Sequence, residues 1–152
     1  MPPQLSTDGF SHEAQWIAEA TEQQRRNLRR SAVLGNEFTF DELVTVWDEC
    51  KHPGWDGFES QPVEWETYHN AYRFLESLPL GAPAPSIGAE PDGELTLEWH
   101  RSTRHTLSVS VTQDGYLHYA ALFGPNRMFG TVAFFGDAPN EILALIDRVD
   151  PA

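Results

Sequence analysis

Apolar and polar side chains alternate after Pro85, and this alternation constrains the fold more than any other feature of the sequence. Successive side chains of a β-strand point to opposite faces, so the pattern predicts strands rather than helices. The sequences Pro91-Asp92-Gly93 and Gln113-Asp114-Gly115 are typical of hairpin turns between such strands. We therefore expect an antiparallel meander of four to five strands, near residues 87–90, 94–101, 105–112, 116–123 and 128–135.

The register of the central strands can be predicted by matching their apolar residues. If Trp99 pairs with Leu107 and Val109 with Tyr119, one face becomes apolar throughout, whereas a shift by one residue would turn every side chain over. The apolar face would hold Leu95, Leu97, Trp99, Leu107, Val109, Val111, Leu117 and Tyr119. The opposite face would hold Thr96, Glu98, His100, Ser108, Ser110 and His118, with Ala120 and Leu122 further along. Because the last strand is apolar on both faces, we expect a terminal helix or a partner to cover that end of the sheet.

The residues before the sheet have helical patterns. A first helix is predicted over residues 11–34 and a second over residues 40–50. Thr39 and Glu42 have the spacing of a capping box at the start of the second helix. A short helix over residues 140–149 is expected to close the chain.

A tight loop and a third helix connect these helices to the sheet. Asp56-Gly57 favours a turn, and we expect Trp55 and Phe58 to anchor it as large apolar side chains. The helix is predicted from about Pro62 to Leu78, because Pro79 prevents its continuation. Its expected buried face, at spacings of three and four, contains Trp65, Tyr68, Tyr72, Leu75 and Leu78, with Ala71 and Phe74 on the flank.

Three motifs stand out between Trp55 and Trp99. They are Trp55-Asp56-Gly57-Phe58, the helix end from Arg73 to Pro79, and Pro91-Asp92-Gly93-Glu94 leading into Leu97-Glu98-Trp99. Together they resemble a family of small bacterial proteins in which a Trp-Asp-Gly-aromatic motif precedes a helix and an antiparallel sheet. The resemblance implies a compact domain from variable gene neighbourhoods, where antitoxins and other inhibitors are common. It supplies no catalytic motif and no established function.

Length and composition favour a single globular domain over residues 1–152. We expect a flexible lead-in at residues 1–10, a helical part at 11–79, and the sheet with its C-terminal helix at 86–150. Cys50 is the one cysteine, so an intrachain disulfide is excluded and a reducing cytoplasm is the expected location. Membrane association is not expected, since no apolar run approaches the roughly 20 residues of a spanning helix.

The chain is strongly acidic, with 23 Asp and Glu against 10 Lys and Arg and a formal net charge of −13. Such a charge disfavours direct binding to nucleic acid or to anionic membranes, because both would be repelled. It favours a basic protein partner or a surface that mimics DNA. Four arginines, Arg25, Arg26, Arg29 and Arg30, form a basic patch that could pair with the acidic body or with a second copy in a homodimer.

The predicted polar face of the sheet holds two weak candidates for chemistry. Ser110 opposite His118, with Glu98 two strands away, has the residue types of a hydrolytic triad. Glu98, His100 and His118 could converge on a metal ion. Neither set has a supporting motif, so we expect no catalytic residues, no metal and no cofactor.

These patterns predict an α+β protein with N-terminal helices and a central helix packed on the antiparallel meander. We expect a non-enzymatic acidic protein that binds and regulates or inhibits a basic protein partner, as an antitoxin, inhibitor or immunity-type protein does. One alternative is a DNA mimic that inhibits a nucleic-acid-binding protein. Another is a small-molecule-binding or hydrolytic protein that uses the open sheet face. The expected contact residues are Trp55, Asp56, Phe58, Asp41, Glu42, Asp48, Glu49, Tyr116 and His118.

Overall fold

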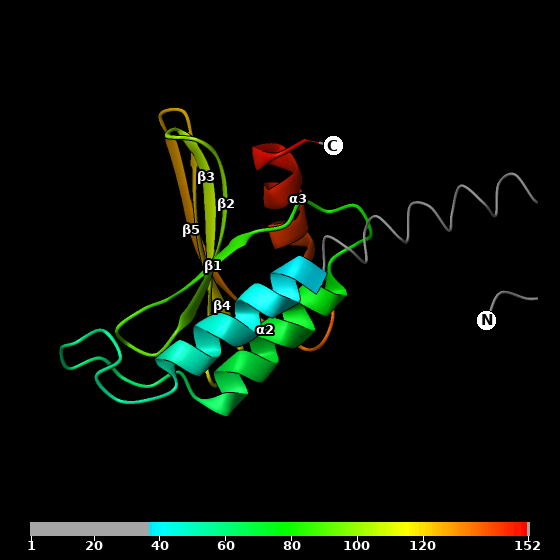
Figure 1. The fold of residues 1–152 in the computed structure, drawn as a ribbon. Coiled ribbons are helices and arrows are strands. Elements are labelled where there is room, and N and C mark those ends of the chain that lie inside the picture. The colour runs from blue at the N-terminus through cyan, green and yellow to red at the C-terminus, as the bar shows by residue number, and fades with distance from the viewer. Residues whose placement is uncertain (1–36, 152) are drawn as a thin grey trace, which may run out of the picture.

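The computed structural model describes residues 37–151 and confirms the α+β class (Figure 1). A helix over residues 37–50 is followed by α2 (Trp65–Ser77), β1 (Ser86–Ala89), β2 (Leu95–Ser102), β3 (His105–Val111), β4 (Tyr116–Phe123), β5 (Asn126–Ala133) and α3 (Asn140–Val149). The lead-in and the helix predicted over residues 1–34 lie outside the described residues.

The five strands form one antiparallel meander in the order β1-β2-β3-β4-β5. Trp99 pairs with Leu107 and Val109 pairs with Tyr119, so the predicted register is confirmed. The strand bounds also follow the prediction to within two residues. The side chains of the sheet therefore divide between two faces as the alternation requires.

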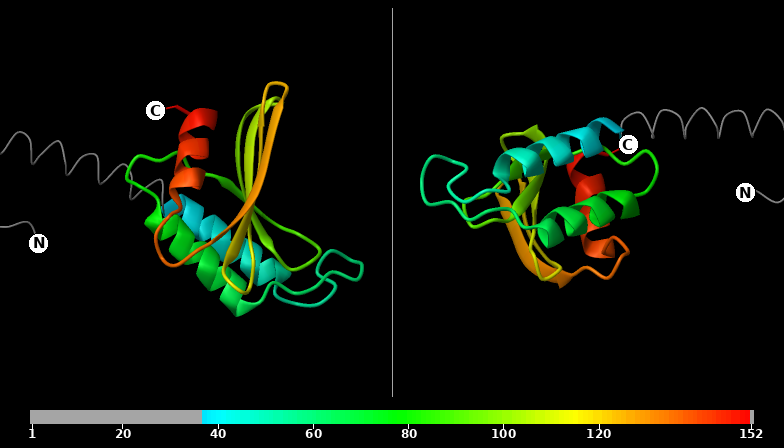
Figure 2. Two further views of the ribbon diagram at one scale, coloured as in Figure 1. Left: turned by 180° about the vertical axis from the view of Figure 1, so that it is seen from behind. Right: turned by 60° about the horizontal axis from the view of Figure 1, so that its bottom comes forward.

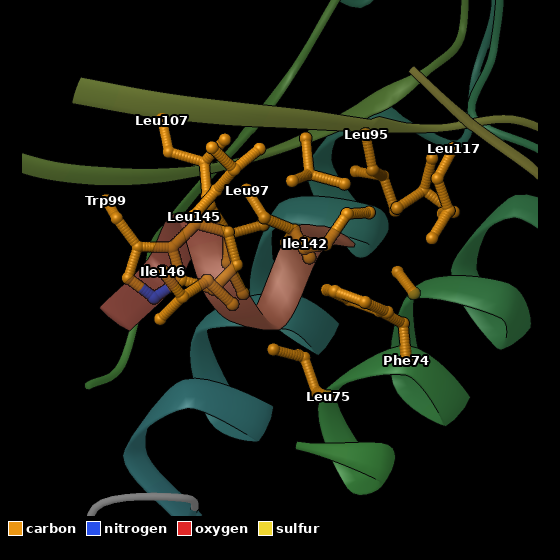
Figure 3. Packing of buried hydrophobic residues seen from close by; sticks show 14 of the residues in the cluster. Phe74, Leu75, Leu95, Leu97, Trp99, Leu107, Leu117, Ile142, Leu145 and Ile146 are labelled. Atoms are coloured by element: carbon orange, nitrogen blue, oxygen red, sulfur yellow. The ribbon is translucent and has the colours of Figure 1, made fainter. Parts of the chain in front are cut away.

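All described helices lie on one side of the sheet, and no other segment of residues 37–151 covers the opposite side, which we call the bare sheet face (Figures 1 and 2). The core forms where the helices meet the apolar sheet face, with Phe74 and Leu75 from α2 and Ile142 from α3 pointing toward the sheet (Figure 3). At the rim of this core, the indole Nε1 of Trp99 donates to the carbonyl oxygen of Pro83 at 2.8 Å.

The helix α2 begins at Trp65, three residues after the predicted start at Pro62. The preceding residues are held by other parts of the chain, because the backbone N–H of Gln61 donates to Pro91 and that of Val63 donates to Cys50, both at 2.8 Å. Val63 is also buried. These tertiary hydrogen bonds keep the segment extended and delay the helix.

The predicted buried face of α2 is correct at Leu75, but the face is turned toward Ala71 and Phe74, which were expected only on its flank. The buried residues are Thr67, Ala71, Phe74 and Leu75, whereas Trp65 is 55% exposed. The aromatic stripe faces the neighbouring helix instead. Ring contacts join Trp47 to Trp65 and Tyr68, Trp65 to Tyr68, Tyr68 to Tyr72, and Phe40 to Tyr72, and we call this group the aromatic seam.

The predicted capping box is also wrong. Thr39 lies inside the helix over residues 37–50 rather than at its N-cap. The carboxylate of Glu42 instead accepts a hydrogen bond from the backbone N–H of Ile87 at 3.1 Å. Glu42 thus joins the helix to the edge strand β1.

The expected cover over the last strand is supplied by α3 only in small part, because α3 packs on β2, β3 and β4 and reaches β5 through a hydrogen bond from Arg148 to the sulfur of Met128 at 3.9 Å. Phe129 on β5 is 72% exposed. The alternative, that a partner covers this strand, stays a prediction.

Candidate functional site

The bare sheet face contains the predicted pair of Ser110 and His118, directly opposite each other on β3 and β4. The Nδ1 of His118, however, is hydrogen-bonded to Oγ1 of Thr131 on β5, at 2.7 Å. A shallow depression of about 440 Å³ lies over this part of the face. Its lining residues are Ser108, Ser110, His118, Tyr119, Ala120, Phe129, Gly130 and Thr131.

The geometry of this face does not connect the groups of a hydrolytic triad. Glu98 pairs with Ser108, one row away from Ser110, and its Oε1 lies 3.7 Å from Nδ1 of His100. His118 contacts Thr131 instead of a carboxylate. Among residues 37–151, no group of three or more His, Cys, Asp or Glu side chains is arranged to hold a metal ion.

The Trp55-Asp56-Gly57-Phe58 stretch is a closed loop that projects from the body of the molecule (Figure 2). The backbone N–H of Gly54 donates to Ser60 at 2.9 Å and that of Gly57 donates to Gly54 at 3.0 Å. Gly57 has a φ of 84°, a conformation that L side chains rarely adopt. The loop is therefore organised by its own backbone.

The two aromatic residues of this loop have different environments. Trp55 packs against the core and its indole Nε1 donates to the carbonyl of Gln61 at 2.8 Å, as expected of an anchor. Phe58 is 83% exposed, so the prediction that it anchors the loop is wrong. Asp56 accepts the backbone N–H of Phe58, and this hydrogen bond holds the pKa of Asp56 below its ordinary value. The loop thus presents Phe58 to solvent from a hydrogen-bonded backbone.

An acidic groove of about 620 Å³ lies between the segment after this loop and the β1–β2 and β3–β4 turns. Its residues are Gln61, Pro62, Glu64, Glu66, Thr67, Asp92, Gly93, Glu94, Thr112, Gln113 and Asp114. Five of these described residues are acidic and none is Lys or Arg. The groove offers several carboxylates to a cationic group.

Hydrogen bonds fix the walls of the acidic groove. Asp92 accepts the backbone N–H of Glu94 at 2.9 Å, and Thr112 donates its hydroxyl to Asp114. The side-chain amide of Asn70 on α2 donates to the carbonyls of Thr112 and Gln113, at 3.0 and 3.2 Å. The β3–β4 turn is therefore tied to α2, and the groove is preorganised.

Two carboxylates of the acidic groove have shifted pKa values in opposite directions. Burial raises the pKa of Glu94, and the negative charge of Asp92 adds to this effect. The hydroxyl hydrogen bond from Thr112 lowers the pKa of Asp114. A cation in the groove would favour the ionised form of Glu94.

The predicted residues Tyr116 and His118 lie on the bare sheet face beside this groove. Thr112 joins Tyr116 to the β3–β4 turn, because its hydroxyl oxygen accepts a hydrogen bond from the backbone N–H of Tyr116 at 2.9 Å. His118 is close enough to Glu94 and Asp114 for its positive charge, when protonated, to favour their ionisation. Tyr116 is half exposed.

The four predicted acids of the helix over residues 37–50 do not form one surface. Glu42 is used internally, as described above. Asp48 is paired with Lys51 at 2.8 Å, and the ammonium group lowers the pKa of Asp48. Asp41 and Glu49 are exposed. The helix ends next to the projecting loop (Figure 1). Asp48 and Glu49 belong to the last turn of this helix, whereas Asp41 lies near its other end.

The charges of the described residues are separated along the strands. We call the end with the projecting loop, the β1–β2 turn and the β3–β4 turn the acidic end; it contains the acidic groove and Phe58. The opposite end, with the β2–β3 and β4–β5 turns, is the basic end. It contains four of the six described Lys and Arg residues, Arg101, Arg104, Arg127 and Arg148, together with Asp147 and Asp150, which flank Arg148 at the end of α3.

The sequence interpretation did not identify the five acids of the groove as one site. A usable signal existed, because alternate turns of a meander lie at the same end of the sheet. Asp92 and Asp114 belong to two such turns. The contribution of Glu64 and Glu66 depends on the packing of α2, which the turn signals do not specify.

Comparison of the chain with models of known families, with curated proteins and with solved structures finds no match. The resemblance of residues 55–99 to a bacterial family therefore remains a similarity of motifs. Within the described part of the chain, no helix has both the length and the apolarity required to cross a bilayer.

Proposed function

We propose that this acidic protein binds a basic protein partner through its acidic end, without catalysing a reaction, and thereby regulates or inhibits that partner. An antitoxin, an inhibitor or an immunity-type protein acts in this way. The observation that carries the proposal is the position of Phe58 on a rigid loop adjoining the five-carboxylate groove. A homodimer is a separate proposal that involves another surface.

An exposed aromatic beside a charged rim has the composition of a binding surface. Aromatic side chains dominate the energetics of many protein interfaces when a partner covers them. The closed loop holds the backbone at Phe58 before binding, so little backbone conformational entropy would be lost on association. Phe58 would enter an apolar pocket of the partner.

The acidic groove would recognise Lys or Arg side chains of the partner. Its walls are already held by hydrogen bonds, and carboxylates bind guanidinium groups with favourable geometry. The acids around the groove would also attract a basic surface at a distance and speed association. The same carboxylates would thus both contact the bound partner and attract it electrostatically before binding.

The open sheet face gives less support to a hydrolytic function. The imidazole of His118 is bonded to Thr131, and Glu98 lies beside His100, so the nucleophile, base and orienting acid are not aligned. The DNA-mimic alternative shares the acidic end with our proposal. The identity of the partner distinguishes the two, because a DNA mimic would bind the nucleic-acid site of its target.

The test is affinity capture of partners from the native host by the full chain, followed by binding measurements with the purified partner. We expect the Phe58→Ala variant to weaken binding by roughly tenfold or more, as loss of a central aromatic contact does. The fold should be unchanged, because Phe58 is 83% exposed.

Leu80→Ala provides the matched control. Leu80 is also an exposed apolar residue, but it lies between α2 and β1, away from the acidic end. Its variant should bind like the wild-type protein. Equal affinities of the Phe58→Ala and wild-type proteins would overturn the role of the loop. Recovery of a turnover activity that requires Ser110 and His118 would favour the hydrolytic alternative.

A further inference from the structure

The strand β5 is an open edge of the sheet in the described part of the chain. It is eight residues long, pairs only with β4, and has Arg127 as its one charged residue. The other edge, β1, has four residues, and Glu42 occupies the backbone N–H of Ile87. Long apolar edges are templates for pairing with another strand, whereas short or blocked edges are not.

The free backbone groups of β5 can be assigned from its pairing. The N–H of Phe134 donates to Gly115 at 2.9 Å, so Phe134 directs its backbone groups toward β4. Because these groups alternate in direction along a strand, Met128, Gly130 and Val132 also face β4. The residues that direct N–H and C=O away from β4 are Arg127, Phe129, Thr131 and Ala133.

We propose that β5 pairs antiparallel with β5 of a second copy of this chain, which joins two sheets into one. Such a contact is symmetric and closes on itself. With Gly130 on the two-fold axis, Phe129 lies opposite Thr131 of the second copy and Arg127 opposite its Ala133. All four outward-facing residues of each strand then form hydrogen-bonded pairs.

The side chains of β5 suit this self-pairing. Met128 would lie opposite Val132 of the second copy on the helix side of the sheet. The exposed ring of Phe129 would be covered by the facing strand on the other side. The two Arg127 side chains would lie at opposite ends of the paired strands, so no like charges meet at the axis.

The separation of charge along the sheet also favours a second copy as the occupant. Antiparallel pairing places the basic end of one copy beside the acidic end of the other. Arg127 of one copy would lie near the end of the second copy that contains Asp114. This arrangement offsets the repulsion expected between two chains that each carry a net charge of −13.

The test is the mass of the full chain in solution, by analytical ultracentrifugation and native mass spectrometry. We expect a species of about 34 kDa, twice the 17.1 kDa of one chain. Phe129→Lys should raise the dissociation constant of the dimer by roughly tenfold or more, because it removes the contact of the ring with the facing strand and places two like charges diagonally across the two-fold axis. Ala120→Lys is the matched control, since Ala120 is exposed on the same face and pairs with Phe129 from β4.

Hydrogen exchange tests the register itself. Amides of residues 127, 129, 131 and 133 should be protected in a concentrated sample and lose protection after dilution of roughly a hundredfold, because the dimer dissociates by mass action. Amides of residues 128, 130 and 132 should stay protected in both samples. Thr131→Pro, which removes one outward N–H and no backbone hydrogen bond to β4, should weaken the dimer and leave the fold intact. Thr131→Ala is its control, because both variants lose the side-chain hydrogen bond to His118 on β4 and only the proline variant loses the outward N–H.

A monomer at every concentration would overturn the proposal, and so would a dimer that Phe129→Lys and Ala120→Lys affect equally. If the outward amides of β5 stayed protected in a monomer, another segment of the same chain would be paired with β5. That result would also overturn the proposed dimer. Partner binding at the acidic end is measured separately with Phe58→Ala, so either proposal can fail alone.

Discussion

Glu42 differs from the other acids of its helix because its carboxylate accepts the backbone N–H of Ile87 on the sheet edge. Glu42→Ala should lower the free energy of unfolding by about 1 kcal/mol, as loss of a half-exposed hydrogen bond to a charged acceptor does. Urea unfolding measures this change. Asp41→Ala is the control. Asp41 is exposed on the same helix, so this variant gains the higher helix propensity of alanine without losing the bond to Ile87. A Glu42→Ala protein as stable as Asp41→Ala would contradict the contact.

Gly93 supports the acidic groove from the β1–β2 turn. Its φ is 92°, and an added Cβ would lie 2.9 Å from the carbonyl oxygen of Pro62. Gly93→Ala should therefore lower the melting temperature through both backbone strain and a clash, at a cost of about 1–3 kcal/mol.

Gly57→Ala separates the two causes. Gly57 has a φ of 84°, but nothing lies within 4 Å of the position that an added Cβ would take, so this substitution adds strain without a clash. Gly93→Ala should consequently melt at a lower temperature than Gly57→Ala. The reverse order would show that the segment at Pro62 moves away freely and that the groove is not rigid.

At the scale of elements, the aromatic seam joins the helix over residues 37–50 to α2. Trp47 stacks on Tyr68 with ring centroids 4.7 Å apart, and its Nε1 donates to the carbonyl of Val63 at 3.0 Å. Trp47→Ala should destabilise the protein by about 3 kcal/mol, because it removes ring contacts and leaves a void. Trp65→Ala, at a position that is 55% exposed, should cost roughly 1 kcal/mol. Chemical denaturation compares the two variants, and equal losses would contradict the larger contribution expected from the less exposed Trp47, whose indole is also hydrogen-bonded.

The acidic groove gives stability a dependence on pH through Glu94. Folding raises the pKa of Glu94 through burial, so the folded state binds its proton more tightly than the unfolded state does. Stability therefore falls as pH rises from the ordinary pKa of glutamate through the raised value in the folded protein. Glu94→Gln should be more stable than wild type at neutral pH.

This gain should disappear in acid below the ordinary pKa of glutamate, where Glu94 is protonated in both states. Urea unfolding of both proteins across the acid range provides the measurement. The shifts at Asp56 and Asp114 are opposite in sign, but they are common to both proteins and cancel in the difference. A gain that grows in acid would contradict the assigned direction.

The sheet could be predicted from the sequence because alternation is a local property. Pairing Trp99 with Leu107 and Val109 with Tyr119 was enough to determine the central register and both faces. The buried face of α2 could not be predicted, because Phe74 packs on the sheet while Tyr68 packs on another helix. Both faces have helical spacing, so periodicity alone does not distinguish them.

The candidate site was predicted only in part, for a related physical reason. The Trp-Asp-Gly-Phe turn was recognised, but the exposure of Phe58 depends on how the loop closes between Gly54 and Ser60. The acidic groove depends on the approach of three separate segments. Such a convergence requires the tertiary structure, although the acids of the two turns indicated which end to examine.

At the scale of the whole molecule, the ends and the edge of one sheet have separate proposed roles. The acidic end, with Phe58 and the groove, is proposed to bind a basic partner. The edge strand β5 is proposed to pair with a second copy. Antiparallel pairing of β5 would place the two acidic ends at opposite ends of the dimer, so each copy would keep its own partner site.

The measurement that tests the central claim most directly is the association rate of the purified partner as a function of ionic strength. The groove variant neutralises all five carboxylates of the acidic groove. It combines the substitutions Glu64→Gln, Glu66→Gln, Asp92→Asn, Glu94→Gln and Asp114→Asn. The matched variant removes the same number of negative charges from positions outside the groove. It combines the substitutions Glu37→Gln, Asp41→Asn, Glu76→Gln, Asp147→Asn and Asp150→Asn.

At low salt, the groove variant should associate roughly tenfold or more slowly than wild type, and the matched variant should lose far less, because steering depends on where the charges lie. The rates of all three proteins should converge as salt screens the charges. Equal slowing by the two variants would mean that net charge alone acts. An unchanged rate for the groove variant at low salt would contradict recognition of a basic partner at the acidic end.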